Sequence, residues 1–288
     1  MKHLRRLRDN RYRRKSGEFL TDGIRVTRRA IGAGLECLGL YVSESTYAAA
    51  GSDAVTGDPR RDLDAKPASA SKTQSEDGHW PLGSPHAADV TVCSEAAMKK
   101  FRYGQSDPAC IGHFRWRDRS LDSIDTDPER LVVILDRMEK PGNVGAIFRS
   151  ADAAGVAAML LCDGGDPLHP NALRNSMGAT LTMPWARSDE RCIRDWCKST
   201  GRDLYAARVE ASHPLDRSGF NSKSAIVLGS EAFGLGQRWS DAAVQGVHIP
   251  MRGMVDSLNV SVAAAVLMFH AAMRAPDGGG TATRRSPG

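Results

Sequence analysis

The sequence contains no run of about 18 or more apolar residues, the length that a membrane-spanning helix needs. The closest stretch, residues 260–272, is shorter and rich in alanine. The N-terminus is basic, but the apolar stretch of a signal peptide does not follow it. We therefore expect a cytoplasmic protein.

The six cysteines form no CxxC pair, the spacing typical of metal and redox sites. We expect the reduced thiols of a cytosolic protein and predict no metal site. The glycine-rich segments also lack the strand–GxGxxG–helix unit, with an acid downstream, that binds dinucleotides. This absence argues against a nicotinamide-dependent enzyme.

Positive charge is concentrated at one end of the chain. The net charge of the whole chain is +5, whereas residues 1–42 alone carry +7. A basic arm, residues 1–15, holds eight Lys or Arg residues, among them Arg11, Arg13 and Arg14. This pattern favours contact with a polyanion such as RNA. The arm is either a solvated, frayed tail or a segment that orders on RNA phosphates, and the two are compatible.

Residues 16–120 predict a small α/β domain with an insertion. The stretch at about 43–86 has too few large apolar residues to offset the entropy of ordering, so we expect disorder there. Residues 120–129 are typical of an interdomain linker. We expect a strand around Phe19, Leu20 and Ile24, further strands at 37–42, 90–93 and 110–115, and helices at 23–33 and 94–101.

Residues 128–275 predict a parallel α/β domain, and residues 276–288 a disordered tail. Continuous apolar stretches such as LVVILD (131–136) are typical of strands buried on both faces, and helical stretches separate them. We expect strands at 131–136, 156–162, 204–207, 225–228 and 246–249, and helices at 144–154, 171–177, 189–199 and 258–274.

Three glycine-punctuated segments lie in this second domain. They are PGNVGAIFR (141–149), IVLGSEAFGLG (226–236) and IPMRGMVDSLNVSVAAAV (249–266). Each runs from a strand or its end, through a loop with polar residues, into a helix-like stretch. Ligands of a parallel sheet bind at such loops. The segments therefore predict a binding site.

In order and spacing, these segments resemble the SPOUT class of methyltransferases, in particular the SpoU/TrmH-type RNA ribose 2′-O-methyltransferases. The resemblance covers roughly residues 130–274, with a shorter match at 15–42. It implies an α/β SPOUT fold, in which a parallel sheet carries a C-terminal trefoil knot with residues 229–260 threaded through a loop. It also implies a small L30e-like RNA-binding domain before it, and S-adenosylmethionine as cofactor.

The resemblance assigns the cofactor to Gly229, Ile249, Met251 and Leu258, and Ala207, at a strand end, is a further candidate. Glycine permits a close approach of backbone amides to the adenosine. The apolar side chains would form a slot. The alternatives are a turn glycine at Gly229 and plain core packing at Ile249 and Leu258.

The resemblance also implies the catalytic residues. Arg149 would clamp an RNA phosphate and polarise the ribose hydroxyl, because an arginine is a demanding choice of base. Asn143 would cap the helix at 144–154 and help to hold Arg149 or the substrate, although a cap-only role is open. Glu231, at the start of another predicted helix, would orient its neighbours.

Further residues are expected near the substrate. Ser257 would cap the closing helix, Asn259 would lie in its first turn, and both would lie near the target ribose. Arg174 resembles an arginine beside the substrate cleft, while Arg11, Arg13 and Arg14 would bind RNA phosphates. A surface position for Arg149 and a structural cap at Glu231 are the alternatives.

The helix at 258–274 is apolar on all sides, which is typical of a buried helix. The resemblance implies a homodimer whose active sites share residues. Ribosomal RNA is the favoured substrate, with an antibiotic-resistance role conceivable and transfer RNA as the alternative. An RNA-binding relative without catalysis is the second hypothesis.

Overall fold

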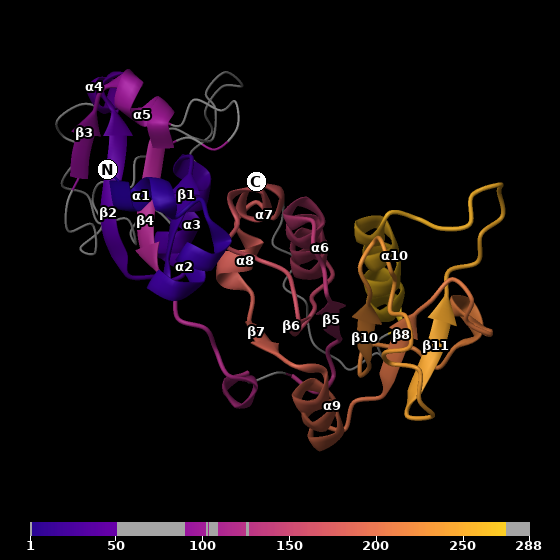
Figure 1. Cartoon of the computed structure of the whole chain (residues 1–288). Coiled ribbons are helices and arrows are strands. Elements are labelled where there is room, and N and C mark those ends of the chain that lie inside the picture. The colour runs from indigo at the N-terminus through magenta and orange to yellow at the C-terminus, as the bar shows by residue number, and fades with distance from the viewer. Residues whose placement is uncertain (1, 51–89, 102, 104–108, 125–126, 275–288) are drawn as a thin grey trace, which may run out of the picture. The chain divides into compact units, whose positions relative to one another are not determined.

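The computed structural model describes residues 2–50, 90–101, 103, 109–124 and 127–274. The chain forms two compact units, one containing Met1–Arg117 and the other beginning at Asp118 (Figure 1). The predicted insertion lies outside the described residues from residue 51 onward, but its first part, 44–50, forms a helix, so the expectation of disorder is wrong there. The predicted tail lies outside the described residues. In the described part of the chain, no helix is long and apolar enough to cross a membrane.

The first unit is a four-stranded mixed sheet with helices. Strand order is β1-β4-β2-β3, where β4 pairs antiparallel with β1 and β2, and β3 pairs parallel with β2. Its elements are α1 (Lys2–Arg6), α2 (Asn10–Ser16), β1 (Glu18–Asp22), α3 (Ile24–Gly32), β2 (Cys37–Ser43), α4 (Glu44–Ala50), β3 (Val90–Cys93), α5 (Glu95–Phe101) and β4 (Cys110–Arg115). Most predicted elements are present, but Ile24 begins a helix rather than belonging to a strand.

The basic arm is folded onto this unit, so the expectation of a frayed tail is wrong. Leu4 and Leu7 are buried with Met98 and Ile111 in an apolar cluster. Asp9 caps α2 because its carboxylate accepts a hydrogen bond from the amide of Tyr12. Apolar residues between the arginines therefore order the arm without a ligand.

The second unit contains a seven-stranded parallel sheet of order β7-β6-β5-β10-β8-β11-β9. Its elements are η4 (Leu121–Ser123), β5 (Val132–Asp136), α6 (Pro141–Ala153), β6 (Ala158–Cys162), α7 (Pro170–Asn175), α8 (Ala179–Thr182), β7 (Trp185–Ser188), α9 (Glu190–Ser199), β8 (Leu204–Ala207), β9 (His213–Pro214), η5 (Leu215–Arg217), β10 (Ala225–Leu228), β11 (Val244–His248) and α10 (Val260–Met273).

Helices cover both faces of this sheet. On one face, Ile193 and Trp196 of α9 pack over alternate strand residues such as Ile134 and Leu160. The intervening strand residues are also buried, so α6 and α10, which pack on one another, cover the other face (Figure 1). Part of the predicted linker belongs to this core, because Ile124 is buried there.

Five short elements of the second unit were not predicted, namely η4, α8, β7, β9 and η5. β9 has only two residues and α8 only one turn, while the edge strand β7 ends in polar Arg187 and Ser188. The start of α6 also differs, since Pro141 occupies the first turn, where proline is favoured, and the helix begins three residues before the predicted start. This shift changes the position of Asn143.

Candidate functional site

Three neighbouring strand ends carry the predicted cofactor residues. β8 pairs in parallel with β10 and β11, so that Ala207 lies opposite Val247. Gly229 and Ile249 directly follow β10 and β11. Ala207, Gly229 and Ile249 therefore lie together at the carboxyl edge of the sheet, where parallel sheets bind their ligands.

Gly229 permits a loop that folds tightly against this edge. A Cβ atom at Gly229 would lie 2.3 Å from the carbonyl carbon of Gly234, closer than any side chain tolerates. The loop is closed by the amide of Gly234, which donates to the carbonyl oxygen of Ser230 at 2.9 Å. Substitution of Gly229 must therefore displace the loop. We define the segment 229–241 as the first cofactor loop.

The two other predicted cofactor residues lie in the segment that links β11 to α10. We define residues 250–258 as the second cofactor loop. Met251 is half-buried, whereas Leu258 is 37% exposed. The neighbouring side chains of Met254 and Val255 are exposed as well. This loop thus presents apolar side chains at the carboxyl edge without burying them.

Asn143 and Glu231 are brought together, but not as predicted. Asn143 lies in the first turn of α6, and Lys140 occupies the N-cap position. The side-chain amide of Asn143 donates a hydrogen bond to Oε1 of Glu231. Residues 231–239 form turns, so the predicted helix beginning at Glu231 is wrong. The pair joins α6 to the first cofactor loop.

Arg149 lies further along α6 and does not meet Asn143. Six residues correspond to about 9 Å along a helix axis and about 240° around it, so the two side chains leave α6 on different sides. The alternative in which Asn143 helps to hold Arg149 is therefore wrong. Arg149 is exposed, and no hydrogen bond or ion pair holds it within the described residues. Its guanidinium group is available to an anionic ligand.

Ser257 and Asn259, the two residues predicted near the ribose, are both exposed. Of the two, Ser257 was predicted to cap α10, but the structure shows otherwise. Asn259, not Ser257, caps α10, because its Oδ1 accepts a hydrogen bond from the amide of Ser261 at 2.9 Å. Asn259 therefore lies before the helix rather than in its first turn. Ser257 belongs to the second cofactor loop.

The predicted substrate arginines divide into two kinds. Arg11, Arg14 and Arg174 are exposed. Arg13 is buried, and its Nη1 donates hydrogen bonds of 2.7 Å to the carbonyl oxygens of Leu7 and Arg8. The prediction that Arg13 binds RNA is thus wrong, because its guanidinium group holds the turn between α1 and α2.

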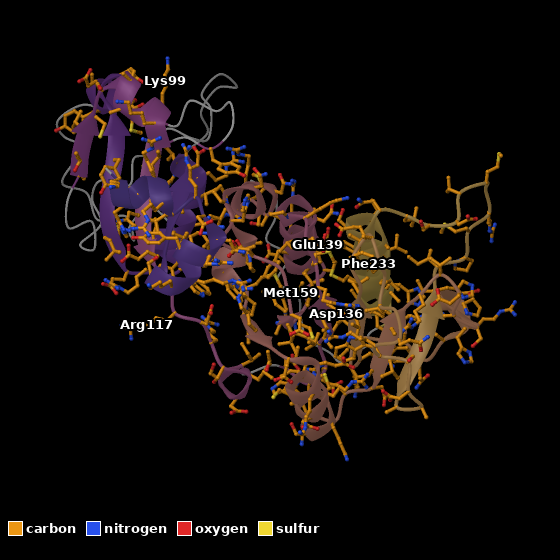
Figure 2. All side chains as sticks on the ribbon, viewed as in Figure 1. Lys99, Arg117, Asp136, Glu139, Met159 and Phe233 are labelled. Atoms are coloured by element: carbon orange, nitrogen blue, oxygen red, sulfur yellow. The ribbon has the colours of Figure 1, made fainter. Side chains whose placement is uncertain are left out.

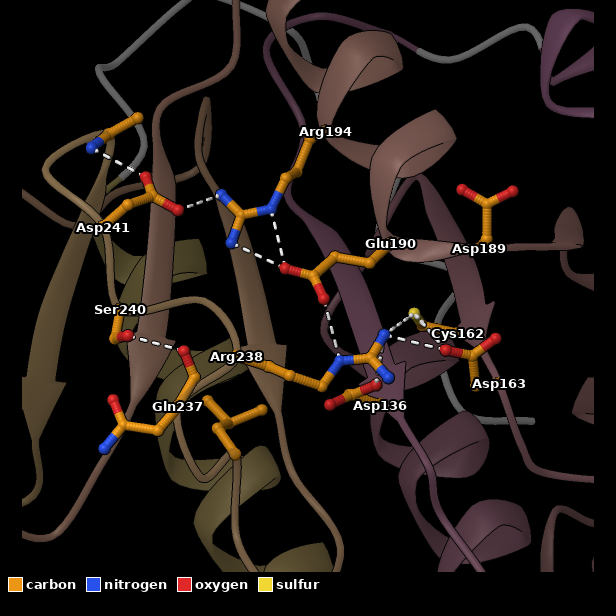
Figure 3. A network of polar contacts seen from close by, with 12 residues as sticks. Asp136, Cys162, Asp163, Asp189, Glu190, Arg194, Gln237, Arg238, Ser240 and Asp241 are labelled. Carbon is orange, nitrogen blue, oxygen red and sulfur yellow. Dashed lines mark hydrogen bonds and ion pairs between the residues drawn. The ribbon is translucent and has the colours of Figure 1, made fainter.

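A network around Arg238 was missed by sequence reasoning (Figure 3). Arg238 lies in the first cofactor loop, and its Nη2 contacts Asp163 at 2.8 Å and Asp136 at 3.4 Å. Its Nε lies 2.8 Å from Glu190, which also pairs with Arg194 of the same helix at 2.8 Å. Asp136 ends β5 and is fully buried. Arg238 therefore ties the loop to two strand ends and to α9.

The protonation of this network follows from its charges. Burial would lower the pKa of Arg238, but the hydrogen bond to Asp163 and the charge of Asp136 raise it above the usual value. Burial, together with the charges of Asp136 and Asp163, raises the pKa of the Cys162 thiol. The arginine is thus held as a cation and the thiol as a neutral group.

Two more arginines hold the main chain of the same loop. Nη1 of Arg208 donates to the carbonyl oxygen of Gly236 at 2.8 Å, and Nη2 donates to that of Arg238. Arg137 Nη2 reaches the carbonyl oxygen of Leu235 at 3.5 Å. Phe233 of this loop, labelled in Figure 2, is 75% exposed. The arginines fix the base of the loop.

Comparisons with known proteins match both units of the chain. The SpoU rRNA Methylase family matches residues 130–269, and the MRM3-like substrate binding domain matches residues 1–106. The 23S rRNA (guanosine(2553)-2′-O)-methyltransferase RlmP of Bacillus subtilis (strain 168) is 31% identical over 142 residues, which are 49% of this chain and 57% of RlmP. The match thus spans little more than half of that relative.

Solved structures match this chain over most of its length. A crystal structure of an RNA 2′-O ribose methyltransferase is 31% identical with a TM-score of 0.72, covering 95% of this chain and 94% of that one. The SpoU methyltransferase AviRb from Streptomyces viridochromogenes, in complex with the cofactor AdoMet, shares the fold at 22% identity with a TM-score of 0.77, covering 94% and 96%.

Fold and site together define a parallel α/β unit whose carboxyl edge carries the predicted cofactor residues, preceded in the chain by a small α/β unit. With these likenesses, the chain belongs to the SpoU rRNA methylase family.

Proposed function

We propose that this protein transfers the methyl group of S-adenosylmethionine to a ribose 2′-hydroxyl of RNA. One observation carries the proposal: Ala207, Gly229 and Ile249 lie at adjacent strand ends, next to a loop joined through Glu231 to the helix of Arg149. This arrangement supports a donor site and an RNA-binding cation on connected elements.

The residues at the carboxyl edge fit the cofactor. The tight loop after Gly229 presents backbone groups, and the half-buried Ile249 and Met251 with Leu258 supply apolar surface for an adenosine. The AdoMet complex of AviRb, which has the same fold, supports this choice. The bound cofactor supplies a methyl group on a positively charged sulfur, so the chemistry needs an aligned oxygen nucleophile.

Arg149 has the principal catalytic role in this proposal. A guanidinium group stays protonated in proteins, so Arg149 clamps an adjacent phosphate and polarises the 2′-hydroxyl rather than taking its proton outright. The clamped RNA phosphate accepts the hydroxyl proton as the new O–CH3 bond forms and the S–CH3 bond breaks. Asn143 and Glu231 position the first cofactor loop on α6. Ser257 and Asn259, both exposed before α10, bind the target nucleotide.

Ribosomal RNA is the proposed substrate. The likeness to RlmP and the match of residues 1–106 to a substrate-binding domain support it. The first unit, for which we propose an L30e-like fold, contacts RNA through exposed arginines including Arg11 and Arg14, and Arg174 contributes from α7. Transfer RNA is the alternative. The proposal includes a cytoplasmic location, and a role in resistance to ribosome-targeting antibiotics is compatible with a ribosomal target.

The proposal includes a trefoil knot in residues 229–260 and a homodimer. α10 leaves apolar side chains uncovered along one stripe, at Val262, Val266, Phe269 and Met273. Their spacing of four, three and four residues keeps them on one face of the helix. A second copy packed there would cover the stripe and bring its own residues beside the exposed Arg149 of α6.

The proposal is tested by incubating the purified full chain with S-adenosylmethionine carrying a tritiated methyl group and with ribosomal or transfer RNA. Digestion to nucleosides identifies the product. We expect a labelled 2′-O-methylnucleoside from ribosomal RNA. A label on a base, or on transfer RNA alone, would correct the reaction or the substrate, and binding of RNA without transfer would favour the non-catalytic alternative.

A further inference from the structure

Two histidines and a glutamate converge within the first unit. His3 lies in α1, Glu18 begins β1, and His113 lies in β4. Nε2 of His3 and Nε2 of His113 lie 2.6 Å and 2.8 Å from the same atom, Oε2 of Glu18. The three atoms all lie within 4.8 Å of one another. Two ring nitrogens thus face one carboxylate oxygen.

The geometry points to a site for a divalent transition metal ion, zinc above all, with His3, Glu18 and His113 as ligands. Two imidazoles and a carboxylate are a donor set that zinc uses in proteins, with water as the fourth ligand. Ligand atoms of a tetrahedral zinc ion lie about 3.3 Å apart. Each Nε2 atom therefore needs to move away from Glu18 by only about 0.5 to 0.7 Å to admit the ion.

The surroundings also suit a metal ion. Nδ1 of His3 lies 2.8 Å from the hydroxyl oxygen of Tyr12. When Nε2 coordinates a metal, Nδ1 carries the proton and donates it to an acceptor such as this oxygen, which fixes the orientation of the ring. The His3 side chain is 42% exposed, whereas that of His113 is 10% exposed. One side of the site is therefore open to an entering ion and to a water ligand.

The ion would join elements that are far apart in the sequence. His3 comes from the helix that carries the exposed Arg5 and Arg6, while Glu18 and His113 belong to paired strands of the sheet. Binding would thus fasten α1 to the sheet and stabilise the folded first unit, because the unfolded chain does not present the three ligands together.

The test uses the full chain freed of metal by a chelator that is then removed. Zn²⁺ is titrated by calorimetry and Co²⁺ by visible absorption. We expect one equivalent of either ion per chain and an increase of the melting temperature with Zn²⁺. Uptake should be lost in His3→Ala and Glu18→Gln, and Tyr12→Phe should weaken affinity about tenfold. His213→Ala, which removes an exposed histidine of β9, is the matched control and should bind normally.

His3→Ala changes a partly exposed side chain and Glu18→Gln keeps the size of the residue, so both variants should fold, as circular dichroism will check. Absence of stoichiometric uptake by the wild-type chain would overturn the inference and leave a hydrogen-bonded cluster only. Uptake that persists unchanged in both variants would also overturn it, because the ligands would then lie elsewhere. Neither result would affect the proposed methyl transfer.

Discussion

The two cofactor loops at the carboxyl edge differ in how they are held. The first, 229–241, is fixed by Arg137, Arg208 and Arg238, and by the bond of Glu231 to Asn143. Within the described residues, the second loop, 250–258, forms no hydrogen bond, and Met254 at its tip is fully exposed.

This difference indicates two roles. A loop held by ion pairs and backbone bonds is pre-organised and needs no ligand to take its shape. A loop with exposed apolar side chains and few bonds has low local stability, and a ligand or a partner surface can order it. We infer that the first loop defines the donor site and that the second closes upon binding.

The largest effect on the rate of methyl transfer is expected from a residue outside both loops. If the loops hold the donor and Arg149 holds the RNA, Arg149→Ala should lower methyl transfer by about a thousandfold or more, since electrostatic stabilisation is a large catalytic term. Cofactor affinity should stay within about tenfold of the wild type, because Arg149 is not part of the donor site. The measurement pairs initial rates with calorimetry. Near-normal turnover would remove Arg149 from the mechanism, and Arg191→Ala on α9 is the matched surface control.

The contribution of each loop to the free energy of unfolding can be compared by substituting one arginine in each loop. Arg238→Ala should lower the free energy of unfolding by about 3 kcal/mol, because the buried Asp136 loses one of its two cationic neighbours. Arg252→Ala in the second loop should change it by less than about 0.5 kcal/mol, since Arg252 is exposed. Urea unfolding measures both. Equal effects would mean that the first loop is no more firmly held than the second.

The exposed apolar stripe of α10, the helix that follows the second loop, is the proposed contact with a second copy of the chain, and a substitution in the stripe tests this contact. Phe269→Glu would place a charge in the proposed interface, so we expect monomers at micromolar concentration where the wild type is a dimer. Analytical ultracentrifugation distinguishes the two. Val92→Glu, a change at another partly exposed apolar residue in the first unit, should leave the dimer intact. A dimeric Phe269→Glu variant would place the interface elsewhere.

The smallest expected effect concerns the dynamics of the loops. Addition of S-adenosylmethionine should slow amide hydrogen exchange in residues 250–258 by about tenfold or more, and by clearly less in residues 234–238, which are already bonded. Mass spectrometry of peptides from each loop gives the comparison. Equal protection of the two loops would contradict the inference that one is pre-organised and the other closes.

Much of the second unit could be predicted because its signals are local. Apolar stretches identify β5, β6, β8 and β10, and the second and third glycine-punctuated segments lie at strand ends as expected, whereas the first, 141–149, lies within α6. Two errors also concern local signals. Asn259 is as good an N-cap for α10 as the predicted Ser257, and Pro141 is as good a first residue for α6 as the predicted residue after Asn143.

The other differences depend on contacts between distant residues. Arg238 meets Asp163 across 75 residues, and Asn143 meets Glu231 across 88. No periodicity or spacing encodes such pairs. For the Arg238 network, the available signal in the sequence was Asp136, the acid that ends β5, because a carboxylate at the end of a buried strand requires a partner. Likewise, the prediction of no metal site was based on the spacing of the cysteines, which gives no information on whether His3, Glu18 and His113 meet.

The central claim is that the carboxyl edge of the parallel sheet binds S-adenosylmethionine, and calorimetric titration of the full chain tests it most directly. We predict one site per chain with micromolar affinity, and a loss of at least about tenfold in Gly229→Ala, where the added Cβ atom collides with the loop at Gly234. A folded wild-type chain that takes up no cofactor, or a Gly229→Ala variant that binds as well as the wild type, would contradict the account.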